Sequence, residues 1–402
     1  MGAKGNLVVG QSGGPTAVIN NSLVGVIHEA MEHAEIEGIY GMLHGIAGIM
    51  NQEFADLRRE SPETLELLRY TPASALGTVR YKVTDDDYPR ILQVFKAHNV
   101  RYFFYIGGND SMDTTNKISQ VAEREGYELH CIGVPKTVDN DLAMTDHCPG
   151  YGSAARFVAA AIRNTALDTE AMGDSGPLKL MEIMGRHAGW LVAATALARQ
   201  ADDDPPHLIY LPEHPVTLEK VIEDVRVVYE RHGFCVAAVS EGVTGPEGKA
   251  IGDTAAPVEV DAFGHKALGG VVDTIADAIR ESLGLRARMD KPGYLQRSFA
   301  ELASPVDREE AYAVGRAAVR VAVKGETGKM VTLVRQTGQG YVWETGLAPL
   351  SEVANKERKM PREYIDDDGN DVTPAFIEYA RPLIGGPLLT YARLAKHPYP
   401  QR

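Results

Sequence analysis

Two carboxylates, a lysine and a threonine stand close together in residues 135–141, which read PKTVDND. Asp139 and Asp141 are separated by one residue, and Lys136 and Thr137 come just before them. A glycine-rich turn at residues 107–111 (GGNDS) lies upstream. Phosphoryl transfer uses such groups. Glycine amides approach phosphate oxygens, a cation neutralises their charge, one carboxylate takes the acceptor proton and another holds Mg²⁺.

Each of these pieces has an ordinary structural explanation when it is taken alone. A Gly-Gly pair after a strand is commonly only a tight turn, and an Asp-x-Asp pair commonly caps a solvated turn. Their placement is more informative, because both pieces follow apolar runs that predict strands, residues 102–106 and 130–134. Open α/β sheets bind ligands at the carboxyl ends of their strands. The pattern therefore favours a catalytic site at that edge.

Strand-like and helix-like segments alternate through the first two thirds of the chain, which predicts βαβ units and mostly parallel sheets. The expected strands are residues 7–9, 102–106, 130–134, 178–184, 207–211 and 234–240. The expected helices are residues 18–34, 111–125, 153–168, 187–200, 218–231, 266–283 and 308–323. From Leu347 onward the chain is rich in proline and charge. We expect a peripheral extension there, whose charge runs, such as residues 356–359, are solvated.

The bulk composition is that of an ordinary globular protein with two or three domains, since 44% of the 402 residues are hydrophobic and 24% are charged. The net charge of −14 argues against nucleic acid or an anionic membrane as a partner. With no signal-peptide pattern and no long apolar run, a cytoplasmic location is expected. The three cysteines have no metal-binding spacing and are expected to be buried free thiols: Cys131, Cys148 and Cys235.

The two segments described first, together with four others in the same order, resemble the phosphofructokinase superfamily. The others are residues 12–14 (SGG), 77–80 (GTVR), 184–186 (MGR) and 292–297 (PGYLQR). The resemblance implies two Rossmann-like three-layer α/β/α domains with mostly parallel sheets, plus a C-terminal extension. It assigns residues 1–148 and 298–346 to a phosphoryl-donor domain, 149–297 to a sugar-phosphate domain and 347–402 to the extension.

Two positions in the donor turns resemble the pyrophosphate-dependent branch of the family. ATP-dependent relatives carry glycine where this chain has Asp110 and Lys136. An aspartate at the first position would repel a nucleotide's α-phosphate, and the lysine would supply a cation to pyrophosphate. The residues expected to bind pyrophosphate are Gly13, Gly14, Arg80, Gly107, Gly108, Asp110, Ser111 and Lys136.

Mg²⁺ is the cofactor that the resemblance implies. We expect Asp141 and the pyrophosphate oxygens to hold it, with Asp110 or Asn109 in a secondary role. Asn109 departs from the acidic residue that is usual at this place in the family, and its amide contributes no charge. Mg²⁺ commonly keeps several waters and needs few protein ligands.

The acceptor residues are carried over from the same resemblance. Asp139 is expected to take the proton from the C1 hydroxyl of fructose 6-phosphate, and the expected catalytic residues are Asp139, Thr137, Lys136 and Arg186. The residues expected to bind the sugar phosphate are Thr137, Asp139, Met184, Gly185, Arg186, Glu241, Arg288, Tyr294 and Arg297. Arginines of the Arg288 type cross a subunit interface in the family, which implies a homodimer or homotetramer. Lys179 is a candidate for a second interface cation.

The implied reaction is reversible, Mg²⁺-dependent transfer of a phosphoryl group from pyrophosphate to fructose 6-phosphate, giving fructose 1,6-bisphosphate and phosphate. Three alternatives stay open. The donor could be ATP, the acceptor could be another sugar phosphate such as sedoheptulose 7-phosphate, or the chain could only bind sugar phosphates. The first expected helix lacks the arginines that form an effector site in allosteric relatives, so strong regulation by nucleotides is not expected.

Overall fold

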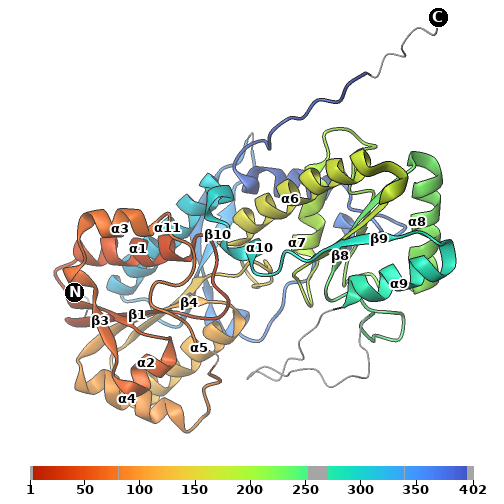
Figure 1. The fold of residues 1–402 in the computed structure, drawn as a ribbon. Helices are drawn as coiled ribbons and strands as arrows, with labels where there is room; N and C mark the ends of the chain where they lie inside the picture. Colours follow the sequence, from red (N-terminus) through yellow and green to blue (C-terminus); the bar gives the residue numbers. More distant parts are fainter. Residues whose placement is uncertain (1–2, 80, 252–269, 339, 396–402) are drawn as a thin grey trace, which may run out of the picture.

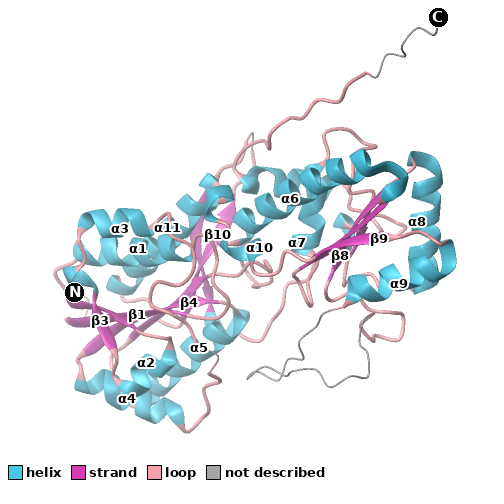
Figure 2. Ribbon diagram, in the orientation of Figure 1, coloured by secondary structure: helices cyan, strands magenta, loops and turns pink. Residues whose placement is uncertain are grey.

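The computed structural model describes residues 3–79, 81–251, 270–338 and 340–395. Two β-sheets lie at opposite ends of an elongated molecule, and each sheet is covered by helices on both faces (Figure 1). Loops at the centre of the molecule connect the two halves (Figure 2). This arrangement confirms the expected α/β architecture of two three-layer units with mostly parallel sheets.

In the described residues, the first sheet has a parallel centre and an antiparallel strand at each edge. Its strands in spatial order are β11 (Trp343–Pro349), β10 (Lys329–Arg335), β5 (His130–Pro135), β4 (Val100–Gly107), β1 (Gly5–Gln11), β2 (Ile36–Met42) and β3 (Phe54–Asp56). Side chains alternate between the two faces. Leu7 and Val9 belong to one buried cluster, whereas Val8 belongs to another on the opposite face.

Both faces of this sheet must be covered because its central strands are apolar on both sides. The upper face in Figure 1 is covered by α1 (Ile19–Met31), α3 (Pro62–Leu68) and α11 (Pro305–Val323). The lower face is covered by α2 (Ile46–Asn51), α4 (Asp87–Ala97) and α5 (Asn109–Arg124). A short 3₁₀ helix, Leu57–Arg59, follows β3.

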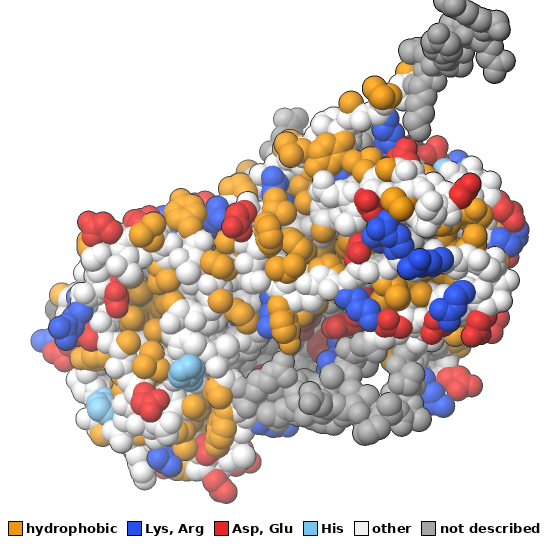
Figure 3. All heavy atoms as spheres, viewed as in Figure 1, with side chains coloured by type: hydrophobic (Ala, Val, Ile, Leu, Met, Phe, Trp, Pro, Cys, Tyr) orange, Lys and Arg blue, Asp and Glu red, His pale blue; other side chains and the backbone are white. Residues whose placement is uncertain are grey.

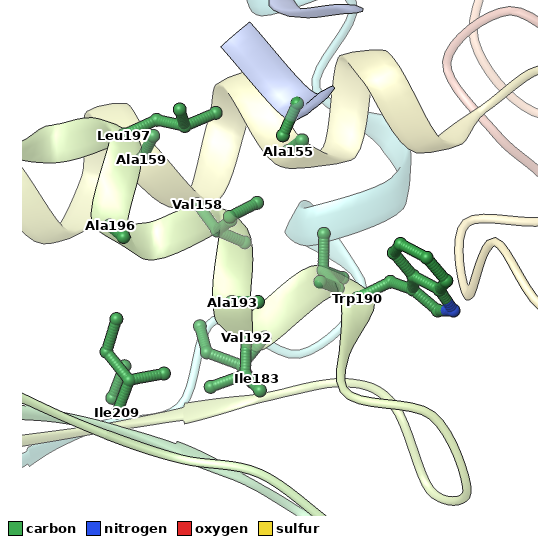
Figure 4. Packing of buried hydrophobic residues seen from close by; sticks show 14 of the residues in the cluster. Ala155, Val158, Ala159, Ile183, Trp190, Val192, Ala193, Ala196, Leu197 and Ile209 are labelled. Carbon is green, nitrogen blue, oxygen red and sulfur yellow. The ribbon is translucent and has the colours of Figure 1, made fainter. Parts of the chain in front are cut away.

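The second sheet is parallel throughout its described strands. Its order is β7 (Leu208–Tyr210), β8 (Cys235–Ser240), β6 (Leu178–Ile183) and β9 (Ala287–Asp290). One face packs on α6 (Tyr151–Met172) and α7 (Trp190–Ala193), and the other on α8 (Leu218–His232) and α9 (Val271–Leu283). Figure 4 shows Val158 of α6, Ile183 of β6 and Ile209 of β7 in one buried cluster.

The helix expected over residues 187–200 is much shorter in the structure. It consists of the single turn α7, followed by a 3₁₀ segment, Ala194–Ala198. Residues 190–198 are all buried between α6 and the second sheet. A run that is apolar on every side carries no helical periodicity, so tertiary packing decides its conformation. The helix expected to begin at residue 266 starts in a segment outside the described residues, and its described part is α9.

The described part of the C-terminal extension enters the cores of both halves, instead of lying at the periphery as expected. Leu350 of α12 (Leu350–Val353) is buried beside Met112 of α5. Phe376 of α13 (Pro374–Ala380) is buried in the cluster that includes α6. The remaining short helices are α10 (Leu295–Ser298) and the 3₁₀ turns Gly173–Ser175, Ala300–Leu302, Arg362–Tyr364 and Arg381–Ile384.

The three cysteines are free and buried, as the sequence predicts. Acidic and basic side chains are interspersed on the face drawn in Figure 3. Within the described ranges, no helix has both the length and the apolar character that crossing a membrane requires.

Candidate active site

The carboxyl ends of β1, β4 and β5 bring together most of the residues expected to bind the donor. These strands are adjacent and parallel, so the turns that follow them share one edge of the sheet. The turn after β1 contains Gly13 and Gly14, the turn after β4 contains Gly107 and Gly108, and Lys136 follows β5. Lys136 Nζ donates to the carbonyl oxygen of Gly14 at 2.8 Å. Its backbone N–H donates to Gly107 O at 3.1 Å.

The turn after β4 leads directly into α5. Gly107 must lack a side chain, because a Cβ atom there would lie 2.1 Å from Ser111 Oγ. Asp110 is exposed in the first turn of the helix, and Ser111 is buried behind it. The N-terminus of α5 presents the positive end of its dipole, which favours an anion. Arg80, expected to bind the same anion, lies outside the described residues.

Two cations meet beside the Gly13–Gly14 turn. Arg297 reaches Gly14 closely, since a Cβ atom at Gly14 would lie 2.4 Å from Arg297 Nη1. Burial and, to a smaller extent, the charge of Arg297 lower the pKa of Lys136 to about 8, although Asp139 and Asp141 oppose the shift. Lys136 is therefore still cationic at neutral pH, and the pair formed by buried Lys136 and partly buried Arg297 suits a multiply charged anion.

The turn after β5 carries the two aspartates expected to do the chemistry. Thr137 Oγ1 accepts from the backbone N–H of Asp139 at 3.1 Å, which fixes the start of the turn. Burial raises the pKa of Asp139, and the carboxylates of Asp141 and Glu241 act in the same direction. Burial also raises the pKa of Asp141. This concentration of partly buried negative charge fits a proton acceptor and a divalent cation in one place.

Asn109 bears on the fit of Mg²⁺. In one orientation its Nδ2 donates to Asp141 Oδ2 at 3.3 Å. In the other, its amide nitrogen donates to Lys356 O at 3.0 Å and Val353 O at 3.3 Å. We favour the second orientation because the amide then donates to two backbone carbonyls, and it turns the amide oxygen toward the Asp141 carboxylate. Carbonyl and carboxylate oxygens are the ligands that Mg²⁺ prefers.

The described residues contain no group of three or more histidine, cysteine, aspartate or glutamate side chains arranged to hold a metal ion. A magnesium ion at Asp141 would therefore depend on substrate oxygens and water for its remaining ligands. Phosphate-bound Mg²⁺ is commonly held in this way. Asp110, the other expected ligand, is exposed in the first turn of α5.

The second sheet supplies the other side of the site through the loop after β6. Gly185 N donates to Glu241 Oε1 at 3.4 Å, and Gly185 O accepts from Ser240 Oγ at 2.6 Å. Burial raises the pKa of Glu241, which Arg186 partly opposes. The Nε atom of Arg186 is buried and has no hydrogen-bond partner among the described residues. A buried, unsatisfied guanidinium donor is costly unless a ligand accepts from it.

The α10 helix connects the two sides. Its Gln296 side chain accepts from Met184 N at 3.0 Å, while Arg297 lies beside Gly14 on the donor side. The guanidinium of Arg297 lies 4.5 Å from the ring centroid of Tyr294, whose side chain is 66% exposed. Gln296 thus connects Met184 with the helix that carries Arg297. No role was assigned to Gln296 from the sequence.

Within one chain, Arg288 does not lie with the other residues expected to bind the sugar phosphate. It lies on β9 and pairs with Asp168 of α6 at 2.8 Å. The nearby Lys179 is buried and pairs with Asp290 at 2.8 Å. The expectation that Arg288 acts across a subunit interface stays a prediction.

One further residue at the site was misjudged from the sequence. Arg358 lies in the run 356–359, which was expected to be solvated. Lys356, Glu357 and Lys359 are exposed, but Arg358 is partly buried and its side chain donates to the backbone carbonyl of Asn140, between Asp139 and Asp141. Its neighbours in sequence give no signal of this, because the contact depends on tertiary packing.

Comparisons with known proteins identify the family of the chain. The family model described as Phosphofructokinase matches residues 6–322. A relative from Rhodospirillum rubrum, named pyrophosphate–fructose 6-phosphate 1-phosphotransferase, is 46% identical over 95% of this chain and 95% of its own length.

The chain belongs to the phosphofructokinase family.

The fold agrees with this assignment. The crystal structure of a pyrophosphate-dependent phosphofructokinase from Marinobacter aquaeolei superimposes with a TM-score of 0.87 at 41% identity, covering 97% of this chain and 94% of that one. A protein from Alkalicoccus urumqiensis named sulfofructose kinase is 35% identical over 90% of this chain and 92% of its own length. The family and its fold are therefore shown, and the relatives differ in the sugar that their names give.

Gly242 offers a test of how the Arg186 loop is held. A Cβ atom at Gly242 would lie 1.8 Å from Arg186 O, so Gly242→Ala must displace the loop. We expect kcat/KM for the sugar phosphate to fall about 10- to 100-fold, because small displacements of positioning groups are costly. Steady-state kinetics measure this effect. Gly245→Ala is the matched control, since its Cβ atom would lie 3.8 Å from Lys249 O, and it should change kcat/KM little. Equal effects in both variants would contradict this role of Gly242.

Proposed function

We propose that this phosphofructokinase transfers a phosphoryl group from pyrophosphate to the C1 hydroxyl of fructose 6-phosphate, with Mg²⁺ as cofactor. The observation that carries the proposal is the placement of Lys136, buried between the Gly14 carbonyl and the turn with Asp139 and Asp141. A glycine there would leave this side of the donor site without its compact cation. The names of the Rhodospirillum rubrum and Marinobacter aquaeolei proteins support the same donor.

On the donor side, Gly13, Gly14, Gly107 and Gly108 let backbone amides approach the pyrophosphate, and Lys136 neutralises its charge. Arg80 and Ser111 belong to the same proposed set. Mg²⁺ held by Asp141 and the phosphate oxygens would neutralise the charge that develops on the leaving phosphate. These contributions are positioning and electrostatics, which supply most of the acceleration in phosphoryl transfer.

On the acceptor side, Asp139 takes the proton as the C1 oxygen forms its bond to phosphorus and the bridging P–O bond of pyrophosphate breaks. Inorganic phosphate leaves, and in the reverse direction Asp139 returns the proton. Thr137 orients the hydroxyl group. The unpartnered Nε of Arg186, the Glu241 carboxylate and Arg297 bind the sugar phosphate, together with Met184, Gly185 and Tyr294. Arg288 completes the set from a second subunit of a cytoplasmic homodimer or homotetramer.

Donor preference is the property that tests this proposal. An anion at Asp110 held ~4 Å from a nucleotide phosphate costs about 4 kcal/mol at an intermediate dielectric constant. We therefore expect the double variant Asp110→Gly, Lys136→Gly to shift the ratio of kcat/KM for ATP to kcat/KM for pyrophosphate by at least about 100-fold toward ATP. Initial rates of fructose 1,6-bisphosphate formation with each donor measure the ratio.

Asp113→Gly is the control for the helix substitution, because Asp113 lies one turn later on α5 and pairs with Lys117 at 3.0 Å. It should leave the donor ratio unchanged. A double variant that keeps the wild-type ratio would remove Asp110 and Lys136 as donor selectors, while the fold and the sugar site would stand.

The name of the Alkalicoccus urumqiensis relative gives a reason to test a second acceptor. The 6-substituent of sulfofructose is a sulfonate with one negative charge, whereas a phosphate carries nearly two at neutral pH. A site with Arg186 and Arg297, completed by Arg288, favours the more highly charged group. Fructose 6-phosphate should therefore exceed sulfofructose in kcat/KM. The opposite order would reassign the acceptor without changing the donor.

A further inference from the structure

Residues 354–360 follow α12 and run across the loops of the site; we call them the C-terminal strap. The carbonyl of Lys356 accepts from the Asn109 amide of the donor turn in the favoured orientation. Glu357 forms an isolated antiparallel bridge with Leu142, just after the two aspartates. The strap therefore contacts both loops that hold the phosphoryl-transfer groups.

Arg358 makes the most contacts from the strap to the turn after β5. Its backbone N–H donates to Asp141 O at 2.7 Å. Its side chain donates to Asn140 O from Nη2 at 2.9 Å and from Nε at 3.3 Å. Nη1 donates to Thr145 O at 3.0 Å and to Asp146 O. One guanidinium therefore satisfies three carbonyls along the turn. Only the planar fork of an arginine supplies donors in this pattern.

Asn140 is the residue between the two aspartates, and its conformation needs this support. It is fully buried with φ of 55°, in the left-handed region that a non-glycine residue rarely adopts. Its Oδ1 accepts from Cys148 N at 3.0 Å, and its Nδ2 donates to Tyr379 Oη at 2.9 Å. The Tyr379 hydroxyl in turn donates to Asp146 O at 2.9 Å. Arg358 and Tyr379 together hold the peptide from which both carboxylates project.

Arg358 is also fixed to the half of the molecule that carries the sugar loop. Trp190, at the start of α7, donates from Nε1 to Arg358 O at 3.0 Å. The guanidinium lies 4.4 Å from the centroid of the Trp190 ring, which suits a cation–π contact. Trp190 is almost fully buried, so it provides a rigid anchor. Arg358 thus links the turn with Asp139 and Asp141 to the half of the molecule that contains the second sheet.

We propose that Arg358 is a positioning residue for phosphoryl transfer: it holds the Asn140 peptide, and through it Asp139 and Asp141, at a set distance from the sugar loop. This inference rests on the proposed function. A displacement of about 1 Å in such groups can cost about 100-fold in rate. Because the guanidinium of Arg358 donates to the backbone carbonyls of Asn140, Thr145 and Asp146, its removal should lower kcat and leave substrate affinity nearly unchanged.

The test compares Arg358→Met with Arg163→Met in the full chain. Arg163 also donates to three carbonyls, those of Leu197, Ala198 and Leu389, but these lie away from the catalytic turn. We expect Arg358→Met to lower kcat about 100-fold, with the KM values of both substrates within threefold of wild type. Arg163→Met should keep kcat. A kcat for Arg358→Met within threefold of that control, or a loss shared between kcat and KM, would overturn the proposal.

Hydrogen–deuterium exchange of residues 137–148 gives a readout that does not depend on activity. Exchange there should be faster in Arg358→Met than in wild type and unchanged in Arg163→Met. If wild type shows no pyrophosphate-dependent turnover, the proposed function fails, and exchange alone then decides whether Arg358 holds the turn.

If Arg358→Met does not fold, Tyr379→Phe tests the same turn by removing one hydroxyl. We expect this variant to have a severalfold lower kcat and an unchanged KM. Unchanged exchange and kcat in Tyr379→Phe would contradict the inference.

Discussion

Asp139→Asn is expected to lower kcat by about 10²- to 10⁴-fold, the range that a general base contributes. The asparagine keeps the size of the side chain and its place in the turn, but it cannot take the proton from the C1 hydroxyl. Affinity for fructose 6-phosphate should stay within about threefold, because Arg186, Glu241 and Arg297 remain in place. Rapid-quench measurement of the chemical step and calorimetric titration of the sugar phosphate separate the two effects.

Stability and metal dependence provide the controls for this variant. Asp139 lies close enough to Asp141 and Glu241 for their charges to raise its pKa, so removing its charge relieves repulsion. The melting temperature should therefore be unchanged or higher. Asp141→Asn should instead raise the Mg²⁺ concentration required for half-maximal rate. If Asp139→Asn kept the kcat of wild type, Asp139 would not be the base. If the variant melted at a lower temperature, its lost activity would be explained by misfolding instead.

His147→Leu should lower the free energy of unfolding by about 3–5 kcal/mol, the usual cost of breaking a buried ion pair. His147 Nε2 lies 2.8 Å from Glu310 Oε2, and Nδ1 lies 2.8 Å from Asp146 Oδ1. The leucine would leave the Glu310 carboxylate buried, with the Tyr341 hydroxyl as its only hydrogen-bond partner among the residues that the structure describes. Urea unfolding followed by circular dichroism measures the loss.

A double variant separates loss of the pair from loss of packing. Replacing both charges, as in His147→Leu with Glu310→Met, removes the uncompensated charge and should recover most of the stability. His33→Gln is the matched control, because it removes a more exposed histidine–glutamate pair at 3.3 Å. It should change the free energy of unfolding by less than about 1 kcal/mol. A double variant as unstable as His147→Leu would contradict the ion-pair account.

The imidazole of His147 should also make the stability of the protein depend on pH. Burial alone would lower the pKa of His147, but the carboxylates of Glu310 and Asp146 outweigh it and raise the pKa to about 9. A histidine whose folded pKa is raised stabilises the protein fully below its unfolded pKa of about 6.5 and loses that contribution as pH rises through about 9. Wild type should therefore lose stability between pH 7 and pH 9.5, and His147→Leu should lose less over that interval.

Much of the site could be predicted because its residues follow strands with clear apolar patterns. Gly107 and Lys136 were placed at one sheet edge from the sequence alone, since parallel neighbouring strands end together. The family resemblance added Gly14. Family resemblance was needed to add Arg186 and Glu241, because those side chains come from the second sheet. No local pattern links the two sheets.

The residues that the sequence did not reveal are those whose role depends on distant packing. Arg358 stands in a run of charges, and only the fold shows that its guanidinium turns inward to the Asn140 peptide. No sequence pattern marks His147, and Glu310, 163 positions later, makes it part of an ion pair. Residues 190–198 are apolar except for Thr195, so their short helical turns could not be distinguished from one long helix.

The most direct test of the central claim is fructose 1,6-bisphosphate formation by the wild-type protein from fructose 6-phosphate and Mg²⁺, followed by ³¹P nuclear magnetic resonance with pyrophosphate or ATP as donor. We predict that pyrophosphate is consumed while the C1 phosphate and inorganic phosphate signals grow together, and that ATP supports little or no turnover. Turnover with ATP and none with pyrophosphate would contradict the account of Asp110 and Lys136.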